Sequence, residues 1–323
     1  MARPKVSIVV CTRNRGKPLR EMMDSLVAMN VPEPLEWELV MVDNGSTDDT
    51  PEIIDSYADL LPLIHVREDQ AGLSFARNRG VATASGDYIV WTDDDVRVKP
   101  DWLSAYLRAF EENPDGAYFG GRITPVFEGK TPTWLTENME RLGNAFAKRD
   151  LGESMRAFTQ ETGDNPFGAN YAVRMEEQRR YEYPTYLGVS PKFRRVGEET
   201  AVLRAIKDEG GEGYWVPDAE VLHIIPESRQ TLQYVSSYQK ALGETWVLLN
   251  GRGEANFIAE QLDPKGIRVG GVHIWIWRNM IGAWAKYRLA KLTSASTHWL
   301  PEFMRYTRYR GAYDYARVAK PFD

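Results

Sequence analysis

The residues best suited to chemistry in this sequence are three consecutive aspartates, Asp93, Asp94 and Asp95. They follow the apolar run YIVWT, which is typical of a buried strand, so they stand where a strand passes into a loop. An Asp-x-Asp pair in such a turn can place two carboxylates on one side, and carboxylate oxygens suit Mg²⁺ or Mn²⁺. A cation held there can neutralise the charge of a departing diphosphate. Acidic turns are more often merely solvated, so this interpretation needs support from elsewhere in the chain.

Two further polar clusters follow apolar runs in the same way. Thr12, Arg13, Asn14 and Arg15 come directly after VSIVVC, and the segment DNGS, which begins at Asp43, comes after WELVMV. In an open α/β sheet, ligands bind at the carboxyl ends of the strands. Three such clusters predict one site for an anionic ligand together with a divalent cation. The alternative is that each residue only makes a turn or a helix cap.

The elements that must position these residues alternate between strand and helix. Strands are expected where the sequence is apolar and β-branched, at 6–11, 37–42, 63–66 and 88–92. Apolar residues at helical spacing predict helices between them, at 19–27, 50–61, 74–84 and 100–110. This order predicts an α/β fold, with a parallel open sheet that carries helices on both faces.

Beyond residue 115 the alternation is less regular. The expected elements are a strand at 117–127, a polar, mobile loop region at 129–166, a return to the sheet at 168–173, a helix at 196–208, two short strands at 214–216 and 219–225, and a helix at 228–249.

Composition bounds the class of protein. The 323 residues are 43% hydrophobic and 27% charged, as in soluble globular proteins, and the net charge of −6 argues against a dedicated nucleic-acid binder. The single cysteine, Cys11, excludes an internal disulfide and a cysteine-based zinc site. No stretch free of Asp, Glu, Lys and Arg exceeds 10 residues, whereas a membrane-spanning helix needs about 20 apolar ones. A signal-peptide pattern is also missing from the N-terminus. We therefore expect a cytoplasmic enzyme.

Charge divides the chain into an acidic body and a basic extension. Residues 264–323 hold eleven basic and three acidic residues, a charge of +8, which leaves −14 for 1–263. The extension is also rich in Trp and Tyr, which favour the headgroup region of a bilayer. We expect a largely helical extension that makes a peripheral contact with the inner face of the cell membrane. The alternative is that it packs on the acidic body or forms a homodimer.

Several familiar sites are missing from the sequence. It contains no G-x-x-x-x-G-K-[ST], no G-x-G-x-x-G after the first strand and no H-E-x-x-H. Their absence argues against a P-loop NTPase, a Rossmann dehydrogenase and a zincin.

Five segments give the chain a family resemblance over roughly residues 5–225. In order they are VSIVVCTRNR (6–15), VDNGSTDDT (42–50), GLSFARNRG (72–80), YIVWTDDDV (88–96) and GEET (197–200). Their order and spacing resemble those of the family 2 glycosyltransferases, which have the GT-A fold. The resemblance implies inverting transfer of a sugar from a nucleoside-diphosphate sugar, with a UDP-sugar favoured, to a hydroxyl of a glycan or a lipid-linked acceptor. It also implies that Mn²⁺ or Mg²⁺ is the cofactor.

The resemblance also assigns roles to particular residues. It implies that a nucleoside pocket is lined by Thr12, Arg13, Asn14 and Asp43, with Asp43 near the base. Arg77 would lie beside the base or the diphosphate. Asp93 and Asp94 would contact the donor, with Asp93 near the ribose, and Asp95 would hold the metal. A histidine downstream of the catalytic base can complete the metal site in related enzymes, and His223 occupies that place here. The alternative for His223 is a buried side chain bonded to backbone.

The catalytic base is expected in the acidic pair Glu198-Glu199, which follows Gly197. Many relatives have Glu-Asp here and use the second position, which makes Glu199 the expected base. An acceptor hydroxyl needs a carboxylate to take its proton as the sugar transfers, which agrees with this assignment. The start of a helix favours an ionised carboxylate, so the pair could instead only complement the helix dipole.

The expected organisation is a GT-A domain at 1–263 followed by the extension at 264–323. Residues 1–127 would bind the nucleotide-sugar, and 128–263 would bind the acceptor and carry the base. One alternative is a sugar nucleotidyltransferase, which would need a glycine-rich loop that CTRNRGKP does not provide. A non-catalytic glycan-binding protein is the other, and it would not need Asp95 and Glu199 together.

Overall fold

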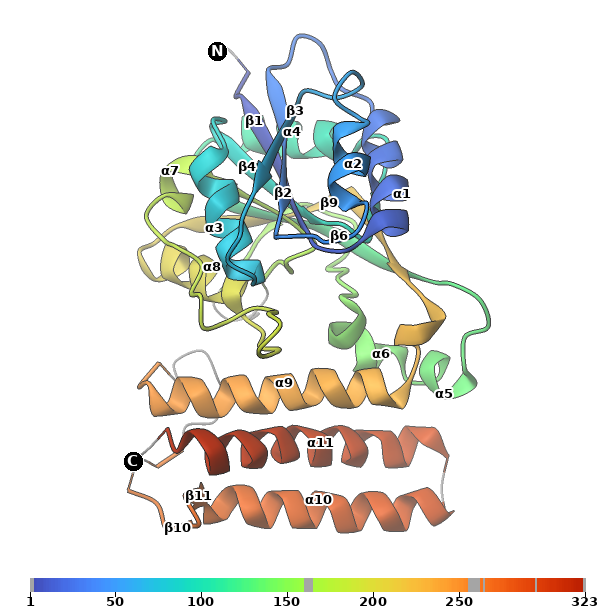
Figure 1. The fold of residues 1–323 in the computed structure, drawn as a ribbon, viewed down its shortest axis with the longest axis vertical. Helices are drawn as coiled ribbons and strands as arrows, with labels where there is room; N and C mark the ends of the chain where they lie inside the picture. Colours follow the sequence, from blue (N-terminus) through green and yellow to red (C-terminus); the bar gives the residue numbers. More distant parts are fainter. Residues whose placement is uncertain (1–2, 160–164, 255–261, 264, 294, 322–323) are drawn as a thin grey trace. The chain divides into compact units, whose positions relative to one another are not determined.

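The structure is a computed structural model that describes residues 3–159, 165–254, 262–263, 265–293 and 295–321 (Figure 1). The chain divides into two compact units. The first consists of Met1–Val126, Phe146–Lys192 and Glu198–Ile224, and the second of Phe127–Ala145, Phe193–Gly197 and Ile225–Asp323. The boundaries expected after residues 127 and 263 divide the chain by role rather than by packing, and they stay predictions.

An open sheet runs through the first unit in the order β3-β2-β1-β4-β8-β6-β9-β5, with β7 paired to β9. Strands β3, β2, β1 and β4 are mutually parallel, and β8, which follows β4 in the sheet, is antiparallel to it. The bounds of the strands are β1 (Val6–Thr12), β2 (Trp37–Asp43), β3 (Leu63–Arg67), β4 (Tyr88–Asp93), β5 (Val96–Val98), β6 (Gly116–Phe127), β7 (Arg156–Ala157), β8 (Asn170–Arg174) and β9 (Glu212–Ile225). The parallel strands therefore form where the apolar runs predicted them.

Helices cover both faces of this sheet, as Figure 1 shows. Alternate side chains of β1 enter different cores: Ile8 packs on one face and Val9 on the other. The first face is covered by α1 (Gly16–Val27), α2 (Thr50–Asp55) and α4 (Trp102–Glu112), and the second by α3 (Leu73–Thr83), α7 (Met175–Gln178) and α8 (Glu198–Asp208). The two-sided burial explains why these strands are apolar along their whole length.

The expected break between two strands near Pro217 was wrong, because β9 runs through it as one strand. Trp215 pairs with β7 and Val221 pairs with β5, so β9 changes partners on one side between these residues. Proline lacks a backbone N–H, and a strand tolerates it where no ladder bond is required.

The expectation of a mobile loop region at 129–166 was also wrong for part of that segment. Short helices form there: α5 (Thr133–Thr136), α6 (Met139–Leu142) and the 3₁₀ turn η1 (Gly143–Phe146). Leu135 and Leu142 are fully buried, which fixes these turns in place. Residues 160–164 lie outside the described residues.

The second unit is dominated by three long helices, α9 (Leu232–Gly251), α10 (Ile274–Thr293) and α11 (Ser296–Ala319). The unit also contains the 3₁₀ turn η2 (Glu227–Arg229) and a small hairpin of β10 (Arg268–Val269) and β11 (Val272–His273). Helix α11 packs on α9 and on α10. The predicted helical character of the basic extension is confirmed. Within the described part of the chain, no helix combines the length and the apolar character needed to cross a membrane.

Glycines let α9 and α11 come into backbone contact. A Cβ atom on Gly311 would lie 2.2 Å from the carbonyl oxygen of Lys240, and one on Gly243 would lie 1.9 Å from that of Arg308. Either side chain would force the helices apart, because real Cβ contacts are never so short. Next to this crossing, Trp246, Trp275 and Tyr309 pack edge to face or at a tilt, which adds apolar contact between the helices.

Candidate active site

The three polar clusters meet at one edge of the sheet. In the register of the parallel strands, Thr12 lies opposite Asp43, and Cys11 lies opposite Asp93. The carboxyl ends of β1, β2 and β4 therefore lie side by side, where an open α/β sheet binds its ligands.

A guanidinium holds the aspartates that follow β4. Thr12 Oγ1 donates to Asp94 Oδ2 at 2.7 Å, Arg15 Nε lies 3.3 Å from Asp94 Oδ1, and Arg15 Nη2 lies 3.1 Å from Asp95 Oδ2. Burial raises the pKa of Asp94 to about 7, although Arg15 opposes the rise. Sequence reasoning placed Arg15 in the same strand-end cluster as Thr12 but did not predict that it pairs with these aspartates.

Asp95 and His223 come from distant parts of the sequence and meet through strand pairing. Val96 lies opposite His223 in the β5–β9 ladder, and Ile224 N donates to Asp95 O at 3.0 Å. The result places His223 Nε2 3.5 Å from Asp95 Oδ1. Burial by itself would lower the pKa of His223, but the neighbouring Asp95 carboxylate raises it overall.

The Asp95–His223 pair fits a divalent cation. His223 Nδ1 lies 3.0 Å from Phe146 O, a bond that fixes the ring and leaves Nε2 facing Asp95. A carboxylate oxygen and an imidazole nitrogen are both accepted by Mn²⁺. Among the residues that the structure describes, no three His, Cys, Asp or Glu side chains form a ready-made metal site. The pair could thus supply two ligands, and the remaining ones would come from water and a bound diphosphate.

Arg77, on α3, occupies a cage of aromatic rings. Its guanidinium carbon lies 5.4 Å from the ring centroid of Trp91, 5.7 Å from that of Tyr171 and 5.4 Å from that of Tyr183, and the residue is only 3% exposed. The side chain was expected beside the base or the diphosphate of a ligand. That role stays a prediction, and the structure shows a buried positive charge held among the three rings.

A directed chain of hydrogen bonds fixes this cage. Arg77 Nη1 donates to Tyr171 OH at 2.6 Å, and because arginine has only donors, the proton of Tyr171 must turn toward Tyr183 OH, 2.6 Å away. Tyr183 OH then donates to Gln178 Oε1 at 3.0 Å. Every hydroxyl in the chain is used once as a donor, which favours a single arrangement of the cage.

Arg77 also links the two acidic motifs. Its Nη2 lies 4.0 Å from Asp93 Oδ1, and its Nε lies 4.0 Å from Glu198 Oε1. Glu198, at the first position of α8, is 5% exposed, and burial together with the charge of Glu199 raises its pKa to about 8. Glu199 is half-buried in the same helical turn. It borders Gly168, where a Cβ atom would lie 3.6 Å from the Glu199 carboxyl.

The expected nucleoside-binding residues hold a pair of loops together. Arg13 Nη1 donates to Asn44 O at 3.0 Å, and Asn14, which adopts a left-handed conformation with φ of 52°, accepts a bond from Thr47 N at 2.8 Å. Asp43 is only 1% exposed. Its carboxylate is compensated within the protein, since Oδ1 accepts from Ser46 N and Oδ2 pairs with Arg67 at 3.0 Å. Arg67 was not predicted, since it lies at the end of a different strand.

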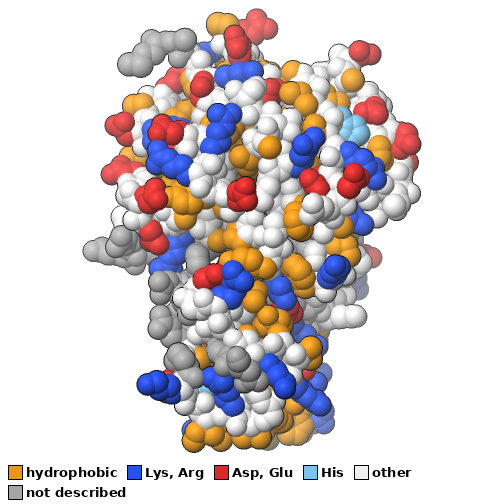
Figure 2. Space-filling view, turned by 60° about the vertical axis from the view of Figure 1, so that its left-hand side comes forward, with side chains coloured by type: hydrophobic (Ala, Val, Ile, Leu, Met, Phe, Trp, Pro, Cys, Tyr) orange, Lys and Arg blue, Asp and Glu red, His pale blue; other side chains and the backbone are white. Residues whose placement is uncertain are grey.

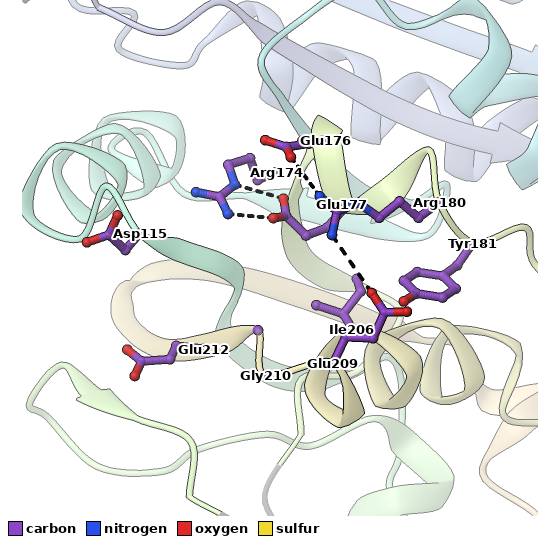
Figure 3. A pocket seen from close by; sticks show the side chains of 11 residues that line it. Asp115, Arg174, Glu176, Glu177, Arg180, Tyr181, Ile206, Glu209, Gly210 and Glu212 are labelled. Atoms are coloured by element: carbon purple, nitrogen blue, oxygen red, sulfur yellow. Dashed lines mark hydrogen bonds and ion pairs between the residues drawn. The ribbon is translucent and has the colours of Figure 1, made fainter.

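A hollow of about 500 Å³ lies away from the candidate site in the first unit (Figure 3). It is lined by Arg174, which pairs with Tyr88 in the ladder, at the opposite end of β4 from Asp93. Arginines neutralise three of its five carboxylates: Arg174 Nε donates to Glu177 at 2.7 Å, and Arg180 pairs with Glu176 at 2.6 Å and with Glu209 at 3.8 Å. This hollow contains none of the residues predicted for the site.

Comparison with solved structures identifies the class of fold to which this chain belongs. Structural similarity extends over nearly the whole chain to the mannosyltransferase PcManGT from Pyrobaculum calidifontis in complex with GDP-Man and Mn²⁺, with a TM-score of 0.58, 18% identity and coverage of 99% of this chain and 88% of the other. S. aureus TarS in complex with UDP-GlcNAc gives a TM-score of 0.56, with 15% identity and coverage of 98% and 91%. At these identities the likeness establishes the fold, which is the GT-A type of glycosyltransferases.

The sequence itself identifies the family. Residues 7–175 match the family described as Glycosyl transferase family 2, and the chain belongs to that family. A curated relative, the glucosyl-dolichyl phosphate glucuronosyltransferase of Haloferax volcanii, is 30% identical over 175 residues. The match covers 53% of this chain, and the chain thus spans about half the length of that relative.

Proposed function

We propose that the chain transfers a sugar, with inversion, from a nucleoside-diphosphate sugar to a hydroxyl of a glycan or lipid-linked acceptor, with UDP favoured as the nucleotide. One observation carries this proposal: a single arginine, Arg77, joins two acidic motifs that are about 100 residues apart in the sequence. Arg77 lies 4.0 Å from both Asp93 and Glu198, and Arg15 lies 3.1 Å from Asp95, which faces His223. Family membership supports sugar transfer over nucleotidyl transfer or simple glycan binding.

The donor is proposed to bind over the carboxyl ends of β1, β2 and β4. Thr12 and Arg13 would border the nucleoside, and Asn14 would shape the loop that follows β1. Asp43 would accept a bond from the base only after the half-exposed Arg67 swings aside, because Asp43 is almost completely buried. Asp93, whose side chain is 40% exposed, is the aspartate of the run best placed to meet the ribose. The buried Asp94 instead orients Thr12 and Arg15.

Asp95 and His223 are proposed to hold a divalent cation, and the His-containing pair favours Mn²⁺ over Mg²⁺. When bound, such a cation neutralises charge on a leaving diphosphate. Arg15 pairs with Oδ2 of Asp95, whereas Oδ1 of the same carboxylate faces His223 Nε2.

Glu199 is proposed as the base that takes the proton of the acceptor hydroxyl. It is more accessible than Glu198, and it stands in the first turn of α8, where it can meet an acceptor hydroxyl that Glu198 cannot reach from its buried position. Glu198 faces the buried cation of Arg77 instead, so its proposed role is to hold the start of α8 against the cage. A single base and no covalent intermediate are sufficient for inversion by in-line attack.

The experiment that tests this function is a screen of nucleoside-diphosphate sugars for slow hydrolysis by the purified protein, with Mn²⁺, with Mg²⁺ and with chelator. The proposal expects release of the nucleoside diphosphate from one donor, dependent on the cation. If no donor is hydrolysed and none changes the thermal stability of the protein, the assignment of the site is wrong.

A further inference from the structure

Helix α10 is apolar on two opposite faces, but only one of them is covered. Ile276 is fully buried and packs with Ala312 and Ala316 of α11. On the other side Ile274, Ile281 and Leu292 are exposed by 40%, 54% and 84%. Their spacing of 7 and 11 residues places them in one line along the helix. A helix with apolar residues on all its faces is normally buried on all of them. The exposed apolar line of α10 therefore indicates that a further partner covers it.

The exposed line is bordered by positive charge. Arg278, Lys286, Arg288 and Lys291 of α10 are all exposed, and the sequence from 264 to 301 contains no acidic residue. Within the described ranges, no carboxylate forms an ion pair with Arg278, Lys286 or Arg288. Figure 2 shows hydrophobic side chains gathered at the lowest edge, where Figure 1 places α10, with Lys and Arg side chains beside them. We call the surface formed by Ile274, Arg278, Ile281, Trp284, Arg288 and Leu292 the α10 outer face.

The positive charge of the α10 outer face indicates which kind of partner can bind there. A second copy of the chain, docked on the same face by two-fold symmetry, would oppose two identical rows of unneutralised cations. A bilayer that contains anionic lipid offers an apolar interior for Ile281 and Leu292 and negative headgroups for Arg278 and Arg288. Trp284, 47% exposed, is a residue type that favours the headgroup region.

We propose that the α10 outer face lies on an anionic membrane surface, with the helix parallel to the bilayer. The described helices are too short or too polar to span it, which agrees with contact from one side. This contact is separate from the proposed sugar transfer and can be measured without any enzymatic activity.

Co-sedimentation of the full chain with vesicles tests the proposal. Phosphatidylcholine vesicles with phosphatidylglycerol should bind the protein, binding should weaken as salt rises, and pure phosphatidylcholine vesicles should bind far less. The variant Ile281→Ser/Leu292→Ser should bind at least about tenfold more weakly, because it removes two exposed apolar side chains that would enter the bilayer. The variant Arg278→Gln/Arg288→Gln should lose about fivefold for each charge.

Matched variants away from α10 are the controls. Leu60→Ser removes an apolar side chain that is 61% exposed in the first unit, and Lys240→Gln removes an exposed charge on α9. Both should bind vesicles as the wild type does. Leu292→Ser alone, at a position that is 84% exposed, guards against a folding defect in the double variant.

Two outcomes would overturn the proposal. One is an absence of binding to anionic vesicles, or binding that the α10 variants leave unchanged. The other is a dimer in lipid-free solution, seen by sedimentation velocity, that Ile281→Ser/Leu292→Ser dissociates. That result would assign the α10 outer face to a second copy of the chain.

Discussion

The guanidinium of Arg77 is enclosed by three aromatic rings and still faces Asp93 and Glu198, each at 4.0 Å. A buried charge is stable only when it is paired and hydrogen-bonded. Tyr171 supplies one of those bonds, at 2.6 Å, and Asp93 supplies opposite charge, whereas a pKa of about 8 keeps a proton on Glu198 at neutral pH. At the scale of single residues, the site therefore depends on side chains that no ligand needs to touch.

Tyr171→Phe tests this dependence. The ring remains, but an Arg77 donor loses its acceptor, and an unsatisfied buried donor costs about 1–3 kcal/mol. The free energy of unfolding, measured in urea, should fall by that amount. Tyr214→Phe is the control, because the Tyr214 hydroxyl bonds to Glu212 in an exposed position. Equal losses in the two variants would show that the Arg77 bond contributes nothing special.

Glu198 gives the stability a pH dependence. Its folded pKa of about 8 lies above the ordinary value of 4.5, so the folded state keeps a proton that the unfolded state releases between these two values. Stability should consequently fall as pH rises from about 4.5 to 8, by at most roughly 1.4 kcal/mol per pH unit. Glu198→Gln should remove this part of the slope in urea titrations at several pH values. An unchanged slope would mean that Glu198 is ionised throughout.

Residue types and order alone predicted which residues lie together at the strand ends, but not the charges that support them. The apolar runs before Thr12, Asp43 and Asp93 fixed these residues at strand ends, because side chains of a two-sided sheet must be apolar. The ion pairs of Arg15 and Arg67 could not be predicted, since nothing local distinguishes a paired arginine from a solvated one. The contact between Asp95 and His223 depends on antiparallel pairing across more than 120 residues, which leaves no local pattern.

At the scale of elements, the close packing of α9 against α11 depends on the glycines at their crossing. Gly311→Ala should weaken the α9–α11 crossing and lower the free energy of unfolding by about 1–3 kcal/mol, the usual range for overpacking. Gly282→Ala is a matched control on α10, because a Cβ atom there meets nothing within 4 Å. That change should be neutral or stabilising by up to about 1 kcal/mol, the helix propensity of alanine over glycine. Thermal unfolding that ranks the two variants in the opposite order would contradict the packing.

The sequence pattern of the C-terminal helices did not predict which of their faces would be buried. The apolar positions of α10 gave no single stripe, which left membrane contact and protein packing equally open. In the structure both faces of the helix are apolar for different reasons: Ile276 packs on α11, whereas Ile281 faces outward. Two apolar stripes on opposite sides of one helix give no single hydrophobic period in the sequence. Only the three-dimensional structure shows which stripe is covered and which is exposed.

At the scale of the whole molecule, ligand binding should be visible as added stability. A nucleoside diphosphate that binds only the folded state raises the melting temperature, and a saturation of 100-fold over Kd is worth about 2.7 kcal/mol. We expect UDP to stabilise the protein with Mn²⁺ and much less with chelator. Asp95→Ala should abolish the cation-dependent part, and His223→Ala should weaken it less.

Asp218→Asn, an exposed substitution on β9, is the control for those variants and should leave the shift unchanged. Equal stabilisation by UDP in Mn²⁺ and in chelator would move charge neutralisation from the Asp95–His223 pair to arginine side chains.

The most direct test of the central claim is the rate of donor turnover by Glu199→Gln, measured with the nucleoside-diphosphate sugar that the wild type hydrolyses or transfers. Loss of a general base predicts a kcat lower by about 10²–10⁴, while the thermal shift given by the nucleotide stays as in the wild type. Asp208→Asn, an exposed change at the other end of α8, should keep full turnover. Turnover by Glu199→Gln within about twofold of the wild type, outside the loss expected for a base, would contradict the assignment of Glu199 as the base.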